Sequence, residues 1–171
     1  LELDEFWGKR LVRSRKDGVQ VIYSLSDDEI PQMLDCLRRV GERHLAEVEL
    51  IVREHFTSDA GLQPVNHQEL TALLKSGDAL IIDVRPPEEY EAGHISGAIN
   101  VPLGMLSRQL IDFPRRREIV AYCRGPYCML AVEAVKRLRK RGYRARRLED
   151  GYPEWKSEGR PVAVGKHSSR N

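Results

Sequence analysis

Between residues 66 and 150 the sequence alternates short apolar runs with stretches of helical periodicity, and this alternation constrains the fold most. The runs "ALIIDV", "AINVP", "EIVAYC" and "ARRLED" have strand character, and segments such as "NHQELTALLKSG", "MLSRQLIDF" and "MLAVEAVKRLRKRG" between them have helical character. Strands separated by helices favour a mostly parallel sheet with helices on both faces. The sequence therefore predicts an α/β fold whose binding sites lie at the carboxyl ends of the strands.

The region before this alternation has a different pattern. "LVRSRKDGVQVIYSL" predicts a β-hairpin that turns at Gly18 and carries Arg13, Arg15 and Lys16 near its tip. Apolar residues then recur every three or four positions, which predicts one long helix over 27–56. A stripe of this length usually packs against a partner helix, so we expect a homodimer through it; the alternative is that the stripe covers the neighbouring domain.

These patterns divide the chain into four parts. We expect an N-terminal region over 1–57, a linker over 58–65 with small and polar residues, an α/β domain over 66–163, and a disordered tail over 164–171.

Composition narrows the class of protein. The net charge of +2 is too small to indicate nucleic acid as a partner, and no apolar run or leader suggests a membrane, so we expect a cytoplasmic protein. Three cysteines form no disulfide framework, and Cys36 has no second thiol or histidine at metal spacing. We therefore expect no metal and no cofactor, and thiols that are available for chemistry.

Cys123 is the candidate for that chemistry. It follows the apolar strand "EIVAY", and the chain must then turn into a helix that begins near Met129. Backbone N–H groups and the positive end of the helix would face the sulfur, and Arg124 adds a cation, so the thiolate is favoured. The alternative is a buried, inert cysteine. The predicted active-site loop comprises Arg124, Gly125, Pro126, Tyr127 and Cys128.

Residues 64–162 resemble the rhodanese-like sulfurtransferases. The resemblance rests on "LIIDVRPPEEYEAGHISGAINVP", "VAYCRGPYC" and "LEDGYPEWKSEGRPV". It implies a single α/β domain in which Cys123 accepts a sulfane sulfur as a persulfide, with thiosulfate or a polysulfide as donor and a thiol as acceptor. Asp83 and Arg85 match the leading motif; a buried carboxylate beside an arginine indicates structural support, as does His94 in its turn.

Phosphoryl transfer, redox sensing and binding without catalysis are the alternative functions of such a loop. The cysteine phosphatases of this fold resemble Cys-x-x-x-x-x-Arg, whereas the sixth position after Cys123 is Met129, which disfavours phosphoryl transfer. Cys128 departs from the commonest rhodanese loops and would allow a disulfide with Cys123, as in a redox or reactive-sulfur sensor; the alternative is a packed thiol at the helix start. A silent binding scaffold is the third possibility.

Residues 9–56 resemble the wing hairpin and final dimerisation helix of ArsR-type winged-helix repressors, in "GKRLVRSRKDGVQVIYSLSDDEIPQMLDCL". The resemblance implies a transcriptional regulator fused to a rhodanese domain, with Arg13, Arg15 and Lys16 as DNA contacts. Bases would be read by helices that precede the wing, so we expect DNA as a partner only where those helices are present. The basic run "KRLRKRGYRARR" is expected to be a solvated face; the alternative is a patch for anions.

Overall fold

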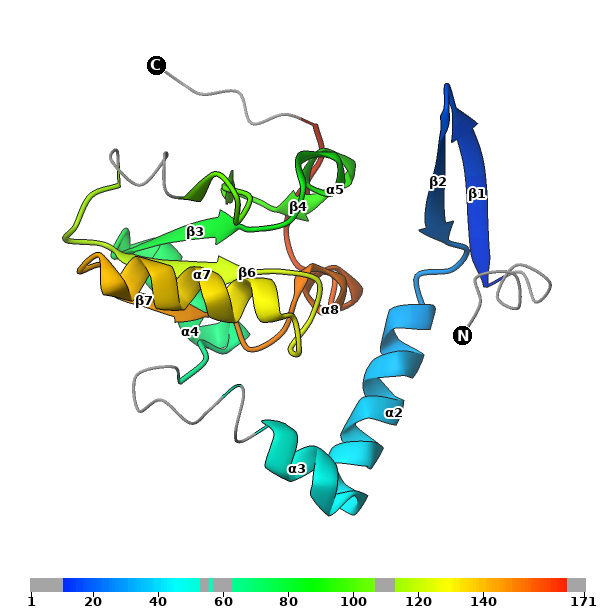
Figure 1. Cartoon of the computed structure of the whole chain (residues 1–171), viewed down its shortest axis with the longest axis horizontal. Coiled ribbons are helices and arrows are strands. Elements are labelled where there is room, and N and C mark those ends of the chain that lie inside the picture. Colours follow the sequence, from blue (N-terminus) through cyan, green and yellow to red (C-terminus); the bar gives the residue numbers. More distant parts are fainter. Residues whose placement is uncertain (1–10, 53–55, 57–62, 107–112, 166–171) are drawn as a thin grey trace. The chain divides into compact units, whose positions relative to one another are not determined.

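The computed structural model describes residues 11–52, 56, 63–106 and 113–165. They belong to two compact units, residues 1–44 and 45–171, and each is described by itself. Figure 1 shows the elements of both along the chain.

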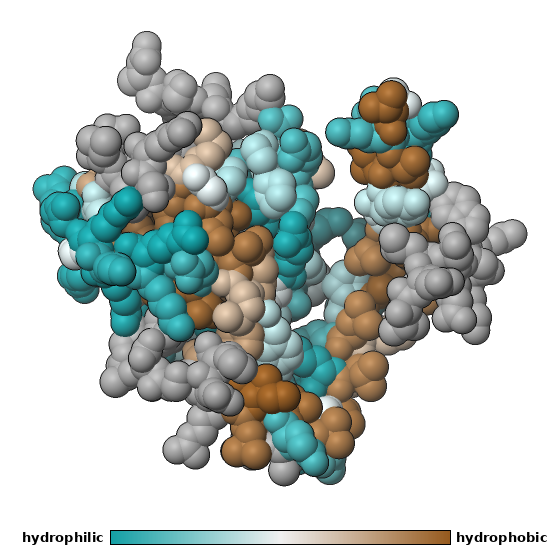
Figure 2. All heavy atoms as spheres, viewed as in Figure 1, coloured by the Kyte–Doolittle hydropathy of each residue, from teal (hydrophilic) through white to brown (hydrophobic). Residues whose placement is uncertain are grey.

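The first unit contains the predicted hairpin. Strands β1 (Val12–Asp17) and β2 (Gln20–Leu25) pair antiparallel, and Gly18 adopts a positive φ of 61° at the turn. Helix α2 (Ile30–His44) follows. Its side chains Met33, Leu34, Leu37 and Val40 are exposed, as are Val19, Val21, Ile22, Tyr23 and Leu25 of the hairpin. Figure 2 shows brown, hydrophobic areas on the surface of the hairpin and of α2.

The expectation of one continuous helix over 27–56 is wrong. Helix α2 ends at His44, and a separate helix α3 (Ala46–Val52) begins after Leu45. The break follows Gly41 by one turn, and glycine costs a helix about 1 kcal/mol relative to alanine. The stripe of apolar residues therefore belongs to two helices in different compact units, and Phe56 lies beyond both.

The second unit is built on the predicted parallel sheet. Its strands are β3 (Ala79–Asp83), β5 (Ile99–Asn100), β6 (Glu118–Tyr122) and β7 (Ala145–Arg147). They pair in parallel in the order β5-β3-β6-β7, so β3 and β6 are central. Every residue of β6 is buried, as expected for a strand covered on both faces.

Helices cover both faces of this sheet (Figure 1). Helix α7 (Met129–Lys140) packs against one face, where Ile119 and Ala121 of β6 point. The opposite face is covered by α4 (His67–Ser76), α5 (Pro87–Ala92) and α8 (Tyr152–Ser157), where Val120 and Tyr122 of β6 point. The α/β architecture expected from the sequence is therefore confirmed.

Local signals also placed the ends of α4. The Asn66 side chain accepts a hydrogen bond from the Glu69 N–H at 2.9 Å, and Gly77 ends the helix with a φ of 76°. These are the N-cap and C-terminal glycine that the segment "NHQELTALLKSG" predicts.

The sequence did not indicate the small antiparallel pair β4 (His94–Ile95) and β8 (Val162–Ala163), in which each strand has two residues. The predicted helix over 105–113 falls largely on residues 107–112, outside the described residues. Among the described helices none combines the length and apolarity needed to cross a membrane.

Candidate functional site: the Cys123 loop

Cys123 directly follows β6 and is buried, with 1% of its surface exposed. Its carbonyl accepts a hydrogen bond from the Tyr152 N–H at 3.0 Å, so the start of α8 fixes the strand end. The chain then makes a β-turn in which the Cys128 N–H donates to the Gly125 carbonyl at 3.2 Å. Pro126 takes the second position of this turn, where its fixed φ is favourable. Helix α7 begins at Met129, directly after the loop.

Cys128 lies beside Cys123. The structure joins the two sulfur atoms as a disulfide, with 6.1 Å between the Cα atoms, a separation normal for disulfides. The loop thus brings the predicted nucleophile and the second thiol into bonding contact. Cys36, in contrast, is an exposed free thiol on α2.

Arg124 is the loop residue that was expected to favour the thiolate. Its guanidinium instead forms a bidentate ion pair with the Glu89 carboxylate of α5, with Nε 3.1 and 3.0 Å from the two oxygens. The Glu89 carboxylate offsets the positive charge of Arg124. The electrostatic effect of Arg124 on Cys123 is therefore smaller than the sequence suggested.

Asp83 and Arg85 form a buried ion pair at the carboxyl end of β3. Arg85 Nη2 lies 2.6 Å from Asp83 Oδ2 and 2.7 Å from the Gly93 carbonyl, and its guanidinium stacks on the Tyr152 ring at 4.5 Å. Burial alone would lower the pKa of Arg85, but the Asp83 carboxylate overcomes this effect and raises it. This pair ties β3 to the turns that carry His94 and Tyr152.

His94 is also buried and is held by its own turn. Its ring stacks on the Tyr90 ring at 3.7 Å, and Nδ1 lies 2.8 Å from the Tyr90 carbonyl. In this arrangement Nδ1–H donates to the backbone. The supporting roles of Asp83, Arg85 and His94 stay predictions that accord with these contacts.

Two glycines allow close packing around the loop. A Cβ on Gly151 would lie 2.2 Å from the Gly125 nitrogen, so the turn between β7 and α8 needs a glycine where it touches the loop backbone. A Cβ on Gly93 would lie 2.1 Å from the Tyr152 hydroxyl. The motif "EDGYPEW" is thus part of the wall of the site.

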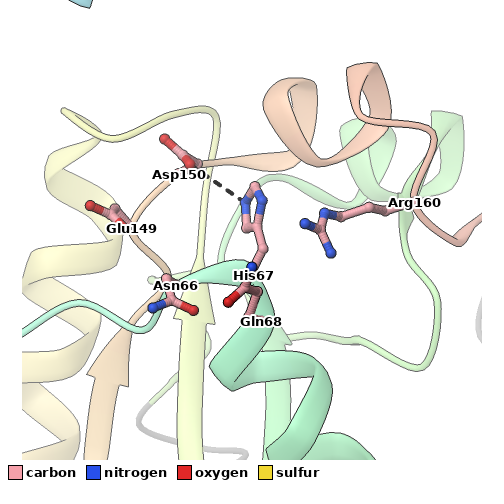
Figure 3. A pocket seen from close by; sticks show the side chains of 6 residues that line it. All are labelled: Asn66, His67, Gln68, Glu149, Asp150 and Arg160. Atoms are coloured by element: carbon pink, nitrogen blue, oxygen red, sulfur yellow. Dashed lines mark ion pairs between the residues drawn. The ribbon is translucent and has the colours of Figure 1, made fainter.

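A separate pocket lies at the start of α4 (Figure 3) and is lined by Asn66, His67, Gln68, Glu149, Asp150 and Arg160. His67 is buried and its Nδ1 lies 2.8 Å from Glu158 Oε2, while Nε2 lies 3.5 Å from Asp150 Oδ2. Several lining groups therefore already pair with groups of the protein itself. None of the residues of the Cys123 loop lines this pocket.

The predicted DNA-contacting residues lie on β1. Arg13 donates to the Ser26 carbonyl at 2.5 Å, and Arg15 pairs with Asp17 at 3.1 Å with both side chains largely exposed. Lys16 lies beside them in the strand and is exposed. DNA contact by these residues stays a prediction.

Sequence reasoning missed three residues around the loop: Glu89, Arg147 and Phe56. Arg147 belongs to the basic run expected to be solvated, yet it is buried, while Arg146 pairs with Glu118 and Glu69. The alternation of β7 was the available signal for Arg147, because neighbouring residues of a strand point to opposite faces.

Within the described parts of the chain no cluster of three or more metal-binding side chains exists.

Comparison with known proteins agrees with this architecture. The model of the Rhodanese-like domain matches residues 66–158, which is more than half of the chain. A solved rhodanese-related protein from Thermoplasma volcanium is 27% identical with a TM-score of 0.53, over 59% of this chain and 97% of that one.

Curated relatives extend the comparison to the N-terminal unit. The HTH-type transcriptional regulator Rv0324 of Mycobacterium tuberculosis is 37% identical over 155 residues, 91% of this chain and 68% of that protein. A sulfurtransferase of Allochromatium vinosum is 30% identical over 54% of this chain and 85% of that protein. The first match is long enough to include most of the hairpin and helices, as in an ArsR–rhodanese fusion. The chain therefore belongs to the rhodanese-like domain family and carries this domain behind a region shared with an HTH-type regulator.

Proposed function

We propose that this protein transfers sulfane sulfur through a persulfide on Cys123. The observation that supports the proposal is the position of Cys123, at the carboxyl end of the central strand β6, where a tight loop leads directly into α7. The match to the rhodanese-like domain and the relatives named as sulfurtransferases support sulfur transfer in general.

The reaction has two displacements. The Cys123 thiolate attacks the outer sulfur of thiosulfate, the S–S bond of the donor breaks, and sulfite leaves with the bonding electron pair. An acceptor thiolate then attacks the outer sulfur of the persulfide, and the Cys123 thiolate leaves. Because both leaving groups are stable anions, no general acid is required.

This cycle requires a reduced loop. With Cys123 and Cys128 joined, the sulfur of Cys123 has no thiolate to attack a donor. The acceptor thiol, or another reductant of the thiol class, must first open the disulfide by thiol–disulfide exchange.

Intact-mass measurement tests the proposal. The reduced protein with Cys36→Ser is exposed briefly to thiosulfate or a polysulfide, beside further variants with Cys123→Ser or Cys128→Ser. We expect a gain of one sulfur atom that disappears with Cys123→Ser, persists with Cys128→Ser, and is lost again when cyanide or a thiol is added. A protein that gains no sulfur from either donor is not a sulfurtransferase.

A second candidate function is favoured by the Cys123–Cys128 disulfide. In this reading the loop senses reactive sulfur: a persulfide forms on Cys123, the Cys128 thiolate attacks the inner sulfur, and hydrosulfide leaves. The sulfane sulfur is the oxidant, so no other electron acceptor is needed. Exposure to polysulfide would then produce a mass lower by two hydrogens that requires both cysteines, with little turnover.

We further propose that a second copy of the chain covers the apolar side of the first unit. The exposed Met33, Leu34, Leu37 and Val40 support this arrangement, since monomeric proteins rarely expose apolar groups in such a row. Sedimentation of the full chain tests it: a Leu37→Glu variant is expected to be monomeric at concentrations where the unchanged chain is a dimer. DNA binding is proposed only for a protein in which helices precede the wing.

A further inference from the structure

Arg147 is a buried cation directly beneath the Cys123 loop. Only 6% of its surface is exposed, and Nη1 donates to the carbonyls of Pro126 at 3.3 Å, Leu148 at 3.3 Å and Glu149 at 3.1 Å. Its Nε is buried without a hydrogen-bond partner among the described residues. Since buried charges are normally paired, a guanidinium bound only to carbonyls is unusual.

Two other arginines of the sheet region, Arg146 and Arg85, behave differently. Arg146, the neighbour on β7, forms ion pairs with Glu118 and Glu69, and Arg85 pairs with Asp83. For Arg147 no ion pair is found among the described residues. Burial lowers the pKa of Arg147, and the more distant Glu149 and Asp150 only partly oppose this effect. Its charge is therefore less compensated than that of either Arg146 or Arg85.

The contact with Pro126 determines the orientation of the loop. The described peptide bonds are all trans, and in a trans peptide the C=O and the following N–H point in opposite directions. While the Pro126 carbonyl points at Arg147, the Tyr127 N–H points away from it. Arg147 thus fixes the direction of a donor in the middle of the turn that joins Cys123 to Cys128.

Phe56, which belongs to none of the strands, packs against both Tyr127 and Arg147. It is 5% exposed although it precedes the domain, and its ring lies edge-on to the Tyr127 ring at 5.5 Å. The Arg147 guanidinium lies over the Phe56 ring, 5.6 Å from the ring centroid. One aromatic side chain from the segment before α4 therefore contacts both the loop and the cation beneath it, and its ring face attracts the cation.

We propose that Arg147 is the positioning residue of the Cys123 loop and that Phe56, from the segment leading to the N-terminal unit, controls how firmly it holds. This inference rests on the proposed persulfide chemistry of Cys123. A fixed loop orients its N–H groups, and Arg147 adds a cation without an ion-pair partner at that loop, so the thiolate and the persulfide of Cys123 are both favoured. Arg147 takes the role that Arg124 loses by pairing with Glu89.

The pH profile of thiol alkylation tests the role of Arg147. The full chain with Cys36→Ser and Cys128→Ser has Cys123 as its only thiol, and its reaction with iodoacetamide is followed by intact mass across the pH range. Arg147→Met is expected to raise the apparent pKa of Cys123 by about one unit, which lowers the rate about tenfold at pH values below that pKa. Arg147→Lys, which keeps the charge but not the fork of donors, should show a smaller shift in the same direction.

Phe56 and Arg146 provide the comparisons. Phe56→Ala is expected to lower the rate about threefold, and Phe56→Leu, which keeps most of the volume without the ring face, about twofold. Arg146→Met is the matched control: it removes a cation from the adjacent residue of β7 and loses two ion pairs, yet its alkylation profile should match the unchanged chain.

Two results would overturn the proposal. One is an alkylation profile of Arg147→Met within twofold of the unchanged chain; the other is an equal shift in Arg146→Met, which would indicate a general loss of stability. If Arg147→Met does not fold, Arg147→Lys and Phe56→Leu carry the same comparison. Alkylation needs no sulfur donor, so failure here is distinct from a failure of Cys123 to accept sulfur.

Discussion

The two compact units of this chain use their apolar residues in opposite ways. In residues 45–171 both faces of the sheet are covered by helices, and the side chains of β3 and β6 are buried. In residues 1–44 both the hairpin and α2 expose most of their large apolar side chains. An amphipathic pattern therefore predicts a helix or a hairpin, but only burial supplies the free energy that stabilises it, about 1.5–3 kcal/mol for each large side chain.

The largest expected difference between the units comes from deleting one apolar side chain in each. Ile82→Ala, in the central strand β3, removes a fully buried side chain and should lower the free energy of unfolding by about 4 kcal/mol. Leu37→Ala, on an exposed face of α2, should change it by no more than about 0.5 kcal/mol in the monomer. Denaturant unfolding measures both; equal losses would mean that the first unit also has a closed core.

A glycine in each unit separates the effect of packing from that of backbone conformation. A Cβ at Gly151 collides with the loop backbone, so Gly151→Ala should cost about 3 kcal/mol and slow alkylation of Cys123. Gly18 has open space around it but a positive φ, so Gly18→Ala should cost the hairpin only about 1 kcal/mol. Hydrogen exchange followed peptide by peptide assigns each loss to its unit, and the reverse order would contradict this account.

The partly buried ion pair between Glu118 and Arg146 in the second unit should give a pH-dependent stability. Hydrogen bonding to Arg146 lowers the pKa of Glu118 below its ordinary value, although burial alone would raise it. The stabilisation is therefore complete above the unfolded pKa of about 4.3 and is lost as the pH falls through the lower folded pKa. Glu118→Gln should cost about 2 kcal/mol at neutral pH, and the difference from the unchanged chain should shrink in acid. A constant difference in chemical denaturation at every pH would exclude this linkage.

The exposed ion pair of the hairpin should give the smallest effect. Arg15 and Asp17 are 69% and 60% exposed, so solvent screens their attraction. Asp17→Asn is expected to change the stability of the hairpin by less than about 0.5 kcal/mol, and added salt should remove even this difference. A change comparable to that of Glu118→Gln would show that the hairpin is less exposed than its side chains indicate.

Local and periodic signals predicted much of the second unit. The order of α4, β3, β5, β6, α7 and β7, both ends of α4 and the position of Cys123 after a buried strand followed from the sequence, because each depends on neighbouring residues; helix α8 was not predicted. The two-residue strands β4 and β8 could not be predicted, since so short a pairing is determined by tertiary contacts. The break between α2 and α3 could not be predicted because the apolar periodicity continues without interruption across it.

Only the contiguous part of the candidate site could be predicted from the sequence. The loop residues are contiguous and were identified together, whereas Glu89, Arg147 and Phe56 approach the loop from distant segments. Arg124 illustrates the limit: its charge was visible in the sequence, but its pairing with Glu89 of α5 depends on the fold.

The close contact between Gly151 and the loop also bears on how this domain can diverge. The turn after β7 touches the backbone of Arg124 and Gly125, with no side chain between them to yield. A loop lengthened to enclose a phosphoryl group would meet this turn, so an insertion and a rearrangement of the β7–α8 connection would have to arise together. A single residue inserted into the loop would therefore also require a change in the β7–α8 connection.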